Sequence, residues 1–470
     1  SAVAQQTPKP WRAEYRALFA LGAPIALTQL VQMSVQTVDV LMIGRLGAEP
    51  LAAAALGVVF FFTVFIVGLG AGVAITPMVS QALGRDPDNV DEVRSAVRMG
   101  LWLAAMIFPF GFVFMANATA IARLLGQPDH LAELAGPYVL ALSPSLFFMT
   151  GVSILRNFLA AIGRTRAPLI FIIATTFLNA GLNYLLIYGS FGFPRWELVG
   201  AGIASTISHG FGFLALVLFC RFDEKARRFR VFRDLFKPDW PRLREVVALG
   251  APIAVTIAFE GMLFNSCVFL MGRIGVDEVA AYQVVLNVAS IAFMAPLGFS
   301  MAGATRIGLA AGAGDQEGVR RAAVATVVVC AASMVLFWLP IMPFPSALVG
   351  FYLDVDRPEN ASVVALATAF VPVAAAFALF DATQVAFNQC LRGLKDVRAP
   401  MVITGVSYWL IGFPLAFWLG LRTDAGAVGV WWGLLVALGF VSLWLGLRLF
   451  RQVRSGGWRR FSEPATAVSS

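Results

Sequence analysis

The chain has 470 residues, of which 59% are hydrophobic and only 13% are charged, with a formal net charge of +8. A soluble domain averages about 25% charged residues, so this composition excludes an ordinary soluble protein of two or three domains. The apolar residues also lie in runs that are too long for a globular core. A helix rising 1.5 Å per residue needs about 20 apolar residues to cross a bilayer.

Twelve apolar runs without Asp, Glu, Lys or Arg predict twelve membrane-spanning helices. In chain order they are 17–38, 50–84, 99–122, 134–155, 167–194, 198–220, 246–259, 279–305, 322–353, 360–380, 399–421 and 425–447. Only 246–259 is short, and its apolar run resumes after the single acid Glu260. Such runs do not fit the short alternating strands of a membrane barrel. The predicted fold class is therefore an all-α integral membrane protein.

Several kinds of chemistry are excluded by motifs that the sequence lacks. The four cysteines lie in or beside apolar runs without CxxC spacing, and the two histidines, His130 and His209, cannot form a zinc site. No GxxxxGK[ST] loop is present, so we expect no bound ATP, no cofactor and no enzyme activity. The first fourteen residues are polar, so no cleaved signal peptide is expected.

Basic residues are distributed unevenly between alternate loops. Of the 35 Lys and Arg residues, 28 lie on one side, six lie on the other, and Arg306 lies at the end of the eighth span. The basic side comprises the termini and the loops near 85–98, 156–166, 221–244, 320–321 and 392–398. The positive-inside rule then places both termini in the cytoplasm, and we expect a monomer in a bacterial inner membrane. The net charge is thus a topological signal, and nucleic-acid binding is not expected.

One internal repeat relates the two halves of the chain. LGAPIA at 21–26 falls on LGAPIA at 249–254, and at this offset of 228 residues 19 of 64 positions are identical. GRTRAPL at 163–169 falls on KDVRAPM at 395–401, at an offset of 232. Each half has an even number of spans, so both insert in the same orientation, as in parallel-repeat secondary transporters. We predict two six-helix lobes around a central cleft.

The lobe boundaries follow from the hydrophilic segments. We assign 1–220 to the N-lobe, including a short cytoplasmic N-terminus, and 246–450 to the C-lobe. The stretch 221–245 is predicted to be a cytoplasmic linker that in part forms an amphipathic helix on the lipid headgroups. Residues 451–470 are predicted to be a cytoplasmic tail.

Three acids, Asp39, Glu260 and Asp381, directly follow apolar runs and lie inside the membrane-spanning helices that those runs predict. An ionisable side chain in lipid is costly, so each acid is a functional hypothesis. Counted along their helices from Arg244 and Arg392, the second and third lie within about 10 Å of each other in depth. Two carboxylates in one low-dielectric cavity must take up a proton or hold a cation, which is the chemistry of ion-coupled transport. Such a cavity favours cationic substrates, and Phe, Met and Trp nearby favour flat, apolar ones.

A pair of amides in the fifth predicted span accompanies the first acid. Asn179 and Asn183 are spaced i and i+4, which puts both side chains on one helix face. They either hydrogen-bond Asp39 or bridge two helices as polar links, and the spacing alone leaves both interpretations open.

Four segments resemble the multidrug and toxic-compound extrusion (MATE) family, in its NorM-like branch. They are TVDVLMIGRLGAEPLAAAALG (37–57), FDATQ (380–384), LRGLKDVRAPM (391–401) and YWLIGFPLAFWLG (408–420). The resemblance covers essentially the whole chain. It implies a secondary antiporter that exports organic, mostly cationic and apolar compounds in exchange for Na⁺ or H⁺, through alternating access of two lobes in the lipid bilayer.

The resemblance also implies roles for the acids. Glu260 and Asp381 match the cation site of the family's C-lobe, where they would bind Na⁺ if the coupling ion is sodium. Asp39 matches the acid of the N-lobe, a site for protonation or substrate that also includes Asn179 and Asn183. The sixth-helix hydroxyl of this second site is expected to be Ser205, with Thr206 as the alternative.

The chain departs from the family pattern at two positions. A tyrosine often found one turn before the tenth-helix acid falls near Phe377, so this ligand is absent and the ion stays open between Na⁺ and H⁺. Asn183 stands where another branch has Asp, which argues against the proton relay of that branch. Gln32, Phe377, Gln384 and Asn287 are expected to line the cavity.

Two other functions are alternatives to export. A flippase of the same superfold, for lipid-linked oligosaccharides or peptidoglycan precursors, carries anionic pyrophosphates and would call for Arg or Lys in the cavity. The three acids have the opposite sign. A membrane-embedded enzyme would need a nucleophile with its base or a set of metal ligands, and the sequence offers neither arrangement.

The repeat relates the helices of the two halves but not their acidic side chains. In the alignment of the two halves, Gln32 corresponds to Glu260, and Asp39 corresponds to Cys267. The N-terminal half therefore carries its acid about two turns closer to the outer surface. Such an offset suits separate sites, one for the coupling ion and one for protonation or cargo.

Overall fold

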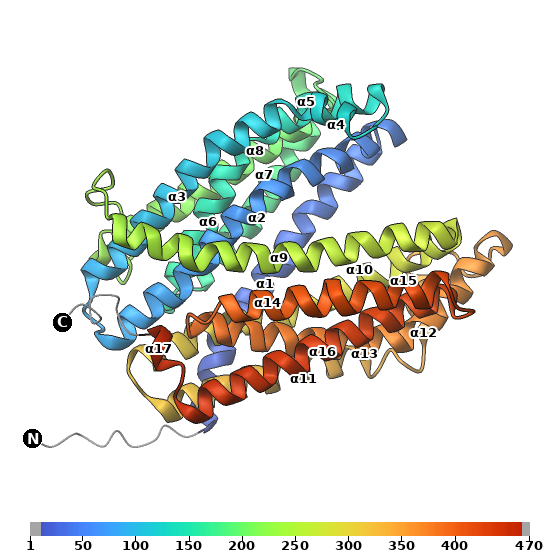
Figure 1. Cartoon of the computed structure of the whole chain (residues 1–470). Helices are drawn as coiled ribbons and strands as arrows, with labels where there is room; N and C mark the ends of the chain where they lie inside the picture. Colours follow the sequence, from blue (N-terminus) through green and yellow to red (C-terminus); the bar gives the residue numbers. More distant parts are fainter. Residues whose placement is uncertain (1–10, 463–470) are drawn as a thin grey trace, which may run out of the picture. The chain divides into compact units, whose positions relative to one another are not determined.

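The computed structural model describes residues 11–462, which form helices joined by turns, without any β-strand in that range (Figure 1). Within it, eleven helices are long and apolar enough to cross a membrane. The number is twelve when Asp129–Leu142 and Ser145–Ala161, which bend by 44°, count as one span. The predicted all-α, multi-span fold is confirmed. The outer parts of the two predicted cytoplasmic ends, 1–10 and 463–470, lie outside the described residues.

The first half of the chain supplies the helices of the first six predicted spans. They are α1 (Trp11–Gly44), α2 (Ala48–Arg85), α3 (Val90–Ala116), α4 (Ala118–Leu124), α5 (Asp129–Leu142), α6 (Ser145–Ala161), α7 (Arg166–Tyr188) and α8 (Leu198–Phe222), with a 3₁₀ turn at Ser190–Gly192. The bend between α5 and α6 lies at Pro144, which lacks a backbone N–H and cannot continue the hydrogen-bond ladder.

The second half supplies the remaining six spans. The helices are α9 (Trp240–Ile274), α10 (Val276–Gly312), α11 (Gln316–Trp338), α12 (Pro345–Gly350), α13 (Ala361–Gly393), α14 (Arg398–Gly405), α15 (Phe413–Leu421), α16 (Gly426–Ser455) and α17 (Arg459–Ser462), with a 3₁₀ turn at Pro358–Asn360. A π-helical segment, Val406–Gly412, joins α14 to α15 within one span.

The chain divides into two compact units. We call residues 28–254 the N-terminal unit, and residues 1–27 with 255–470 the C-terminal unit. Both boundaries fall inside a helix, α1 or α9, at positions that the repeat makes equivalent. Each lies two or three residues after a proline, Pro24 or Pro252, where the helix loses a backbone hydrogen bond. Each half of the repeat therefore begins its first helix in one unit and ends it in the other.

Glycines at equivalent positions permit the same close helix crossing in both units. In the N-terminal unit, a Cβ on Gly70 of α2 would lie 2.5 Å from the carbonyl oxygen of Gly250 in α9. In the C-terminal unit, a Cβ on Gly298 of α10 would lie 2.3 Å from the Cα of Ala26 in α1. Any larger residue would force the two backbones apart, so the repeat conserves this contact.

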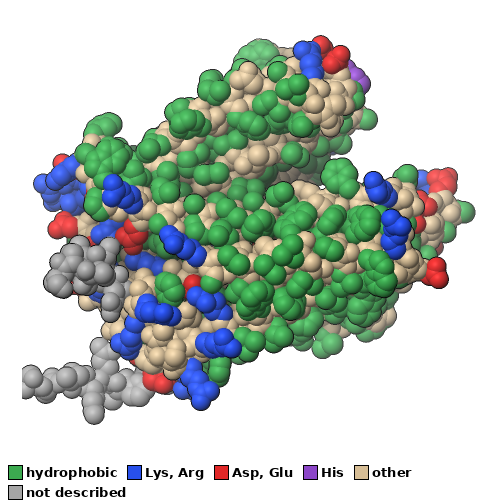
Figure 2. Space-filling view, viewed as in Figure 1, with side chains coloured by type: hydrophobic (Ala, Val, Ile, Leu, Met, Phe, Trp, Pro, Cys, Tyr) green, Lys and Arg blue, Asp and Glu red, His purple; other side chains and the backbone are tan. Residues whose placement is uncertain are grey.

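Each unit has its own apolar core and an apolar outer surface. Phe60, Phe61 and Phe65 of α2 belong to the core of the N-terminal unit, and Tyr282 and Trp431 to that of the C-terminal unit. Many large hydrophobic side chains are nevertheless exposed, as expected for surfaces that face lipid. Figure 2 shows hydrophobic side chains along the middle of each unit and Lys and Arg gathered toward the ends.

The segment between α8 and α9 differs from the prediction. Residues 223–239 contain a 3₁₀ turn, Arg227–Phe229, and no α-helix, so the predicted amphipathic helix is wrong. The left-handed backbone of Arg230 (φ 44°) ends the turn. Arg94 and Trp102 of α3 donate hydrogen bonds of 2.9 and 2.6 Å to carbonyls of this segment. These contacts hold the linker on α3 and replace the hydrogen bonds that a helix would have made.

Candidate functional site

Asp39 of α1 forms the centre of a polar cluster in the N-terminal unit. The Nδ2 atoms of Asn179 and Asn183, both on α7, donate hydrogen bonds of 2.6 and 2.7 Å to its Oδ1. The Oγ of Ser205 on α8 donates to its Oδ2 at 3.3 Å. Three donors compensate part of the hydration that a carboxylate loses inside a membrane-embedded unit. The two amides that the sequence places on one helix face thus meet the first-helix acid.

Further contacts decide which groups belong to this cluster. Thr206 donates to the carbonyl oxygen of Ala141 at 2.6 Å, so Ser205 is the sixth-span hydroxyl that contacts the acid. Within 11–462, the buried Oδ1 atoms of both asparagines have no hydrogen-bond partner. The cluster therefore offers more acceptors than donors, which suits a water, a proton donor or a cationic group.

Gln32 lies seven residues before Asp39 on α1 and pairs with an arginine. Nη1 of Arg156 on α6 donates to its Oε1 at 3.4 Å. The buried Nε of Arg156 has no partner in the described part of the chain. The sequence-based placement of this arginine in a loop is wrong, because α6 continues to Ala161. No glycine or proline occurs between Arg156 and Gly163, so nothing ends the helix directly after this arginine.

Glu260 of α9 and Asp381 of α13 lie close enough to interact electrostatically in the C-terminal unit. Nε2 of Gln384, one turn along α13, donates to Oδ1 of Asp381 at 3.1 Å. The same glutamine is a hydrogen-bond partner of Glu260. Since a side-chain amide carries two N–H donors, one glutamine can serve both carboxylates. The two acids that the sequence places at similar depth thus share one polar neighbour.

The polar face of α13 extends beyond these acids. Asp381, Gln384, Asn388 and Arg392 recur every three or four residues, which aligns them along one side of the helix. Arg392 is 6% exposed and interacts electrostatically with Glu260. It lies in the last turn of α13, so the loop predicted near 392–398 begins after Gly393. Two acids and one arginine leave one negative charge in excess when all three are ionised.

The π-helical segment Val406–Gly412 carries Tyr408, which interacts electrostatically with both acids, and the segment has a local cause. Pro414 lacks a backbone N–H, and its ring crowds the carbonyl of Leu410 four residues earlier. The α-helical hydrogen-bond ladder is interrupted there, and the turn widens to the π pattern. Gly405 precedes the segment, and a Cβ on it would lie 2.9 Å from the ring of Phe259. This close approach brings the segment beside Glu260, the next residue of α9.

This span carries three buried hydroxyl groups, one of them near the acids, that were not anticipated from the sequence. Tyr408 is 1% exposed and interacts electrostatically with both carboxylates. As far as the structure describes the chain, the hydroxyls of Thr404, Ser407 and Tyr408 and both amide atoms of Asn388 are buried without a partner. A native membrane protein rarely buries so many unpaired polar atoms, so this cluster is built to hold water or an ion.

Phe377 contributes no polar group to the cluster. Its ring lies 5.8 Å from that of Phe264 and 5.6 Å from that of Trp431, in edge-to-face contacts within the core of the C-terminal unit. Tyr408 is thus the tyrosine near the acids, and it comes from a different span than the family pattern suggests. Its sequence signal was weak, because an uncharged polar pair inside an apolar run does not stand out.

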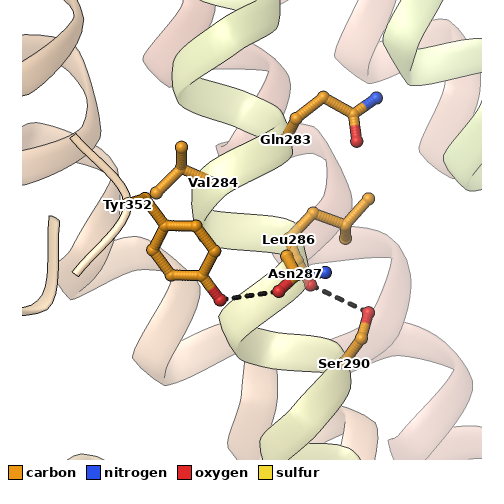
Figure 3. Close-up of a pocket in the computed structure, with 6 residues that line it drawn as sticks. All are labelled: Gln283, Val284, Leu286, Asn287, Ser290 and Tyr352. Carbon is orange, nitrogen blue, oxygen red and sulfur yellow. Dashed lines mark hydrogen bonds between the residues drawn. The ribbon is translucent and has the colours of Figure 1, made fainter. Parts of the chain in front are cut away.

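Asn287 of α10 lines a separate pocket of about 370 Å³ (Figure 3). Tyr352, which follows α12, donates a 2.6 Å hydrogen bond to its Oδ1. Neither Glu260 nor Asp381 lines this pocket. Elsewhere in 11–462, no three His, Cys, Asp or Glu side chains group as metal ligands. A bound ion would therefore depend on amide and hydroxyl oxygens as well as carboxylates, a donor set that hard cations accept.

Sequence comparisons relate both halves to one family. The MatE family model matches residues 24–185 and 252–418, one segment in each half. A "Probable multidrug resistance protein NorM" of Rhizobium meliloti (strain 1021) is 41% identical over 460 residues, covering 96% of each chain. A protein of the same description from Mesorhizobium japonicum is 38% identical over 420 residues, covering 89% of this chain and 90% of the relative.

Solved structures share the fold. The Vibrio cholerae MATE transporter VcmN in its bent form superposes with a TM-score of 0.84 at 19% identity, covering 96% of this chain and 99% of that one. The eukaryotic MATE transporter AtDTX14 superposes with a TM-score of 0.82 at 21% identity, covering 96% of this chain and all of that one.

Proposed function

We propose a function from the premise that this chain belongs to the MatE family. It is a multidrug efflux transporter of the membrane, as its NorM relatives are described to be. We infer that it exports organic, mostly cationic and apolar compounds in exchange for Na⁺ or H⁺, by alternating access. No ATP and no covalent chemistry on the substrate enter this proposal.

The observation that carries ion coupling is the cluster around Glu260 and Asp381. With both acids and Arg392 ionised it holds one excess negative charge, and a single monovalent cation or proton would neutralise it. Buried carboxyl groups without a counter-charge are costly in a membrane, so binding of the ion stabilises the cluster substantially. We assign Tyr408 and Asn388 as neutral ligands that replace part of the hydration shell of the ion. Arg392 limits the site to one positive charge.

The cluster around Asp39 is proposed to serve protonation or substrate binding. Its three donors hold the carboxylate in one orientation, and the two unpaired amide oxygens can accept hydrogen bonds from a cationic drug. An organic ammonium group placed there would meet one charged and two neutral acceptors. Separate ion and cargo sites let the two ligands act on different units of the same carrier.

The remaining expectations concern topology and assembly. The excess of Lys and Arg on one side supports cytoplasmic termini in a bacterial inner membrane. We propose that 1–220 and 246–450 form the lobes of the transport cycle, that 221–245 and 451–470 are cytoplasmic, and that the monomer is the functional unit.

A flippase for lipid-linked pyrophosphates is the second candidate, and Arg156 is the observation in its favour. This arginine has no acidic partner in the described chain, and its Nε is buried and unpaired. A cargo phosphate would satisfy it. If the protein were such a flippase, Arg156→Gln would abolish translocation of a fluorescent pyrophosphate lipid. Drug export predicts instead that the wild-type protein does not move this lipid.

The test of the proposed function is export from proteoliposomes with Na⁺ and proton gradients imposed separately. A fluorescent organic cation is the substrate, and Glu260→Gln and Asp381→Asn are the variants. Both conserve side-chain size, so folding should persist, and gradient-driven export should be abolished. The matched control is Glu278→Gln, an acid in the first turn of α10 that is outside the cluster. Gradient-driven export by either cluster variant would refute the assignment of the coupling site.

A further inference from the structure

A pocket that the proposed transport function does not use lies at the C-terminal end of α16 in the C-terminal unit. Its volume is about 360 Å³, and Arg448, Arg451 and Arg460 line it. Figure 2 shows basic side chains gathered over the end of the unit where α16 and α17 meet. Among residues 11–462, no acidic side chain lines the pocket. Three guanidinium groups around one cavity are suited to bind an oxyanion, because each offers paired N–H donors.

One of the three arginines is already neutralised. Nε and Nη2 of Arg448 donate bonds of 2.6 and 3.0 Å to the carboxylate of Asp396, which is 2% exposed. Nε2 of Gln452 donates to the same carboxylate at 3.2 Å. This bidentate pair with a buried carboxylate holds the Arg448 side chain where it lines the pocket. Arg451 and Arg460 are exposed at its rim, and neither has an acidic partner among the residues described. The pocket therefore has two positive charges in excess.

The remaining wall is apolar and continuous with the lipid-facing surface. Trp444 and Leu447 line the pocket and are 37% and 50% exposed. Leu443 and Phe450, on the same helix, are 64% and 59% exposed. Since α16 has the length and composition of a membrane span, these side chains face acyl chains. A cavity with a cationic rim and an apolar wall at the end of a span matches a phospholipid better than a soluble anion.

We propose that this pocket binds the phosphate group of an anionic glycerophospholipid, of the phosphatidylglycerol or cardiolipin class, in the cytoplasmic leaflet. Arg451 and Arg460 are the phosphate ligands, and Trp444 and Leu447 contact the first part of an acyl chain. Arg448 contributes one edge of its guanidinium, held by Asp396. The choice of the cytoplasmic leaflet rests on the proposed topology, whereas the lipid site itself is independent of ion coupling, because the coupling cluster and this pocket share no residue.

The test measures lipid binding to the purified full-length protein in neutral detergent by native mass spectrometry. The probes are phosphatidylglycerol, phosphatidylcholine with the same acyl chains, and inorganic phosphate. The variant Arg451→Gln with Arg460→Gln removes the two unpaired ligands. The control, Arg454→Gln with Arg459→Gln, removes equal charge from neighbouring exposed arginines that do not line the pocket. Both sets are exposed, so melting temperatures without lipid should match the wild type.

We expect phosphatidylglycerol to bind at least about tenfold more tightly than phosphatidylcholine, since a charge-assisted hydrogen bond contributes roughly this factor. The pocket variant should lose at least about tenfold, and the control less than about twofold. An equal loss in the control would show a diffuse basic surface and overturn the proposal. Displacement of the lipid by inorganic phosphate at millimolar concentration would show a site for free anions, and equal binding of both lipids would refute any headgroup site.

Discussion

Where the C-terminal unit carries Glu260, the N-terminal unit carries Gln32, which accepts a hydrogen bond from Arg156. Where the N-terminal unit carries Asp39, the C-terminal unit carries Cys267, which is fully buried in its apolar core. The same positions are thus acidic in one unit and neutral in the other. The two units therefore share a fold but carry their acidic residues at different positions of the repeat.

The partner helices show the same displacement. At the offset of 232 residues, Ser407 and Tyr408 correspond to Thr175 and Thr176 of α7. Both threonine hydroxyls donate to carbonyls of their own helix at 2.8 Å, whereas the hydroxyls of Ser407 and Tyr408 are buried without a partner in the described chain. The N-terminal unit instead uses asparagines one to two turns later. In the N-terminal unit, both the acid and its polar partners therefore lie one to two helical turns later than their counterparts in the C-terminal unit.

The largest expected effect separates the two acid clusters by ion dependence. Asp381→Asn should reduce Na⁺- or H⁺-driven export at least about a hundredfold, because it removes a buried charge that the ion must neutralise. Binding of an organic cation, measured by fluorescence polarisation, should change less than about threefold. A large loss of drug affinity would show that the C-terminal cluster also binds the drug. It would contradict the proposed division of ion and drug binding between the two units.

Asp39→Asn should produce the next largest effect, with the opposite pattern. We expect about a tenfold loss of drug affinity, because the substitution removes the charge but keeps the hydrogen-bonding shape. The apparent affinity for the coupling ion should stay within about twofold. His209→Ala is a control in the same unit, since this histidine contacts Ser145 and not the acid. A comparable loss in the control would reduce Asp39 to a structural residue.

Tyr408→Phe should have an intermediate effect confined to the ion. Removal of one neutral ligand should raise the ion concentration for half-maximal export by several-fold, with the maximal rate nearly unchanged. Tyr282→Phe is the matched control, because this buried tyrosine donates to the carbonyl oxygen of Phe264. The assay is initial efflux against ion concentration. An unchanged ion requirement would remove Tyr408 from the site while leaving the assignment of both acids intact.

The smallest expected effect concerns the close helix crossing that both units share. Gly70→Ala and Gly298→Ala each place a Cβ within 2.5 Å of the facing helix backbone, so each should cost about 1–3 kcal/mol through overpacking. The expected result is a similar decrease of a few degrees in melting temperature for both variants. A decrease in only one of them would mean that the repeat no longer conserves this crossing.

Local rules predicted much of this molecule. Each of the twelve apolar runs overlaps one of the eleven spanning helices or the bent helix pair, because length and hydropathy suffice to identify a span. The i, i+4 spacing of Asn179 and Asn183 gave a common face, which is a property of the helix alone. Whether these amides contact Asp39 depends on how α1 packs against α7. The spacing of the two asparagines could not decide this.

What the sequence did not reveal depends on tertiary contacts. Arg156 and Arg392 lie near helix ends, where a charged residue is naturally taken to mark a loop, yet packing extends both helices past them. Ser407 and Tyr408 sit in an apolar run, and only the facing acids give them a role. The division of α1 and α9 between units follows from packing across distant segments, to which a hydropathy profile is blind.

Direct ion binding to the purified protein tests the division of labour between the two clusters most directly. Radioactive Na⁺ binding, and proton release followed with a pH indicator, would be measured for the wild type, Asp39→Asn and Glu260→Gln, with and without an organic cation. We predict that Asp39→Asn binds the coupling ion like the wild type and that Glu260→Gln does not bind it. Retained ion binding in Glu260→Gln together with its loss in Asp39→Asn would contradict the account.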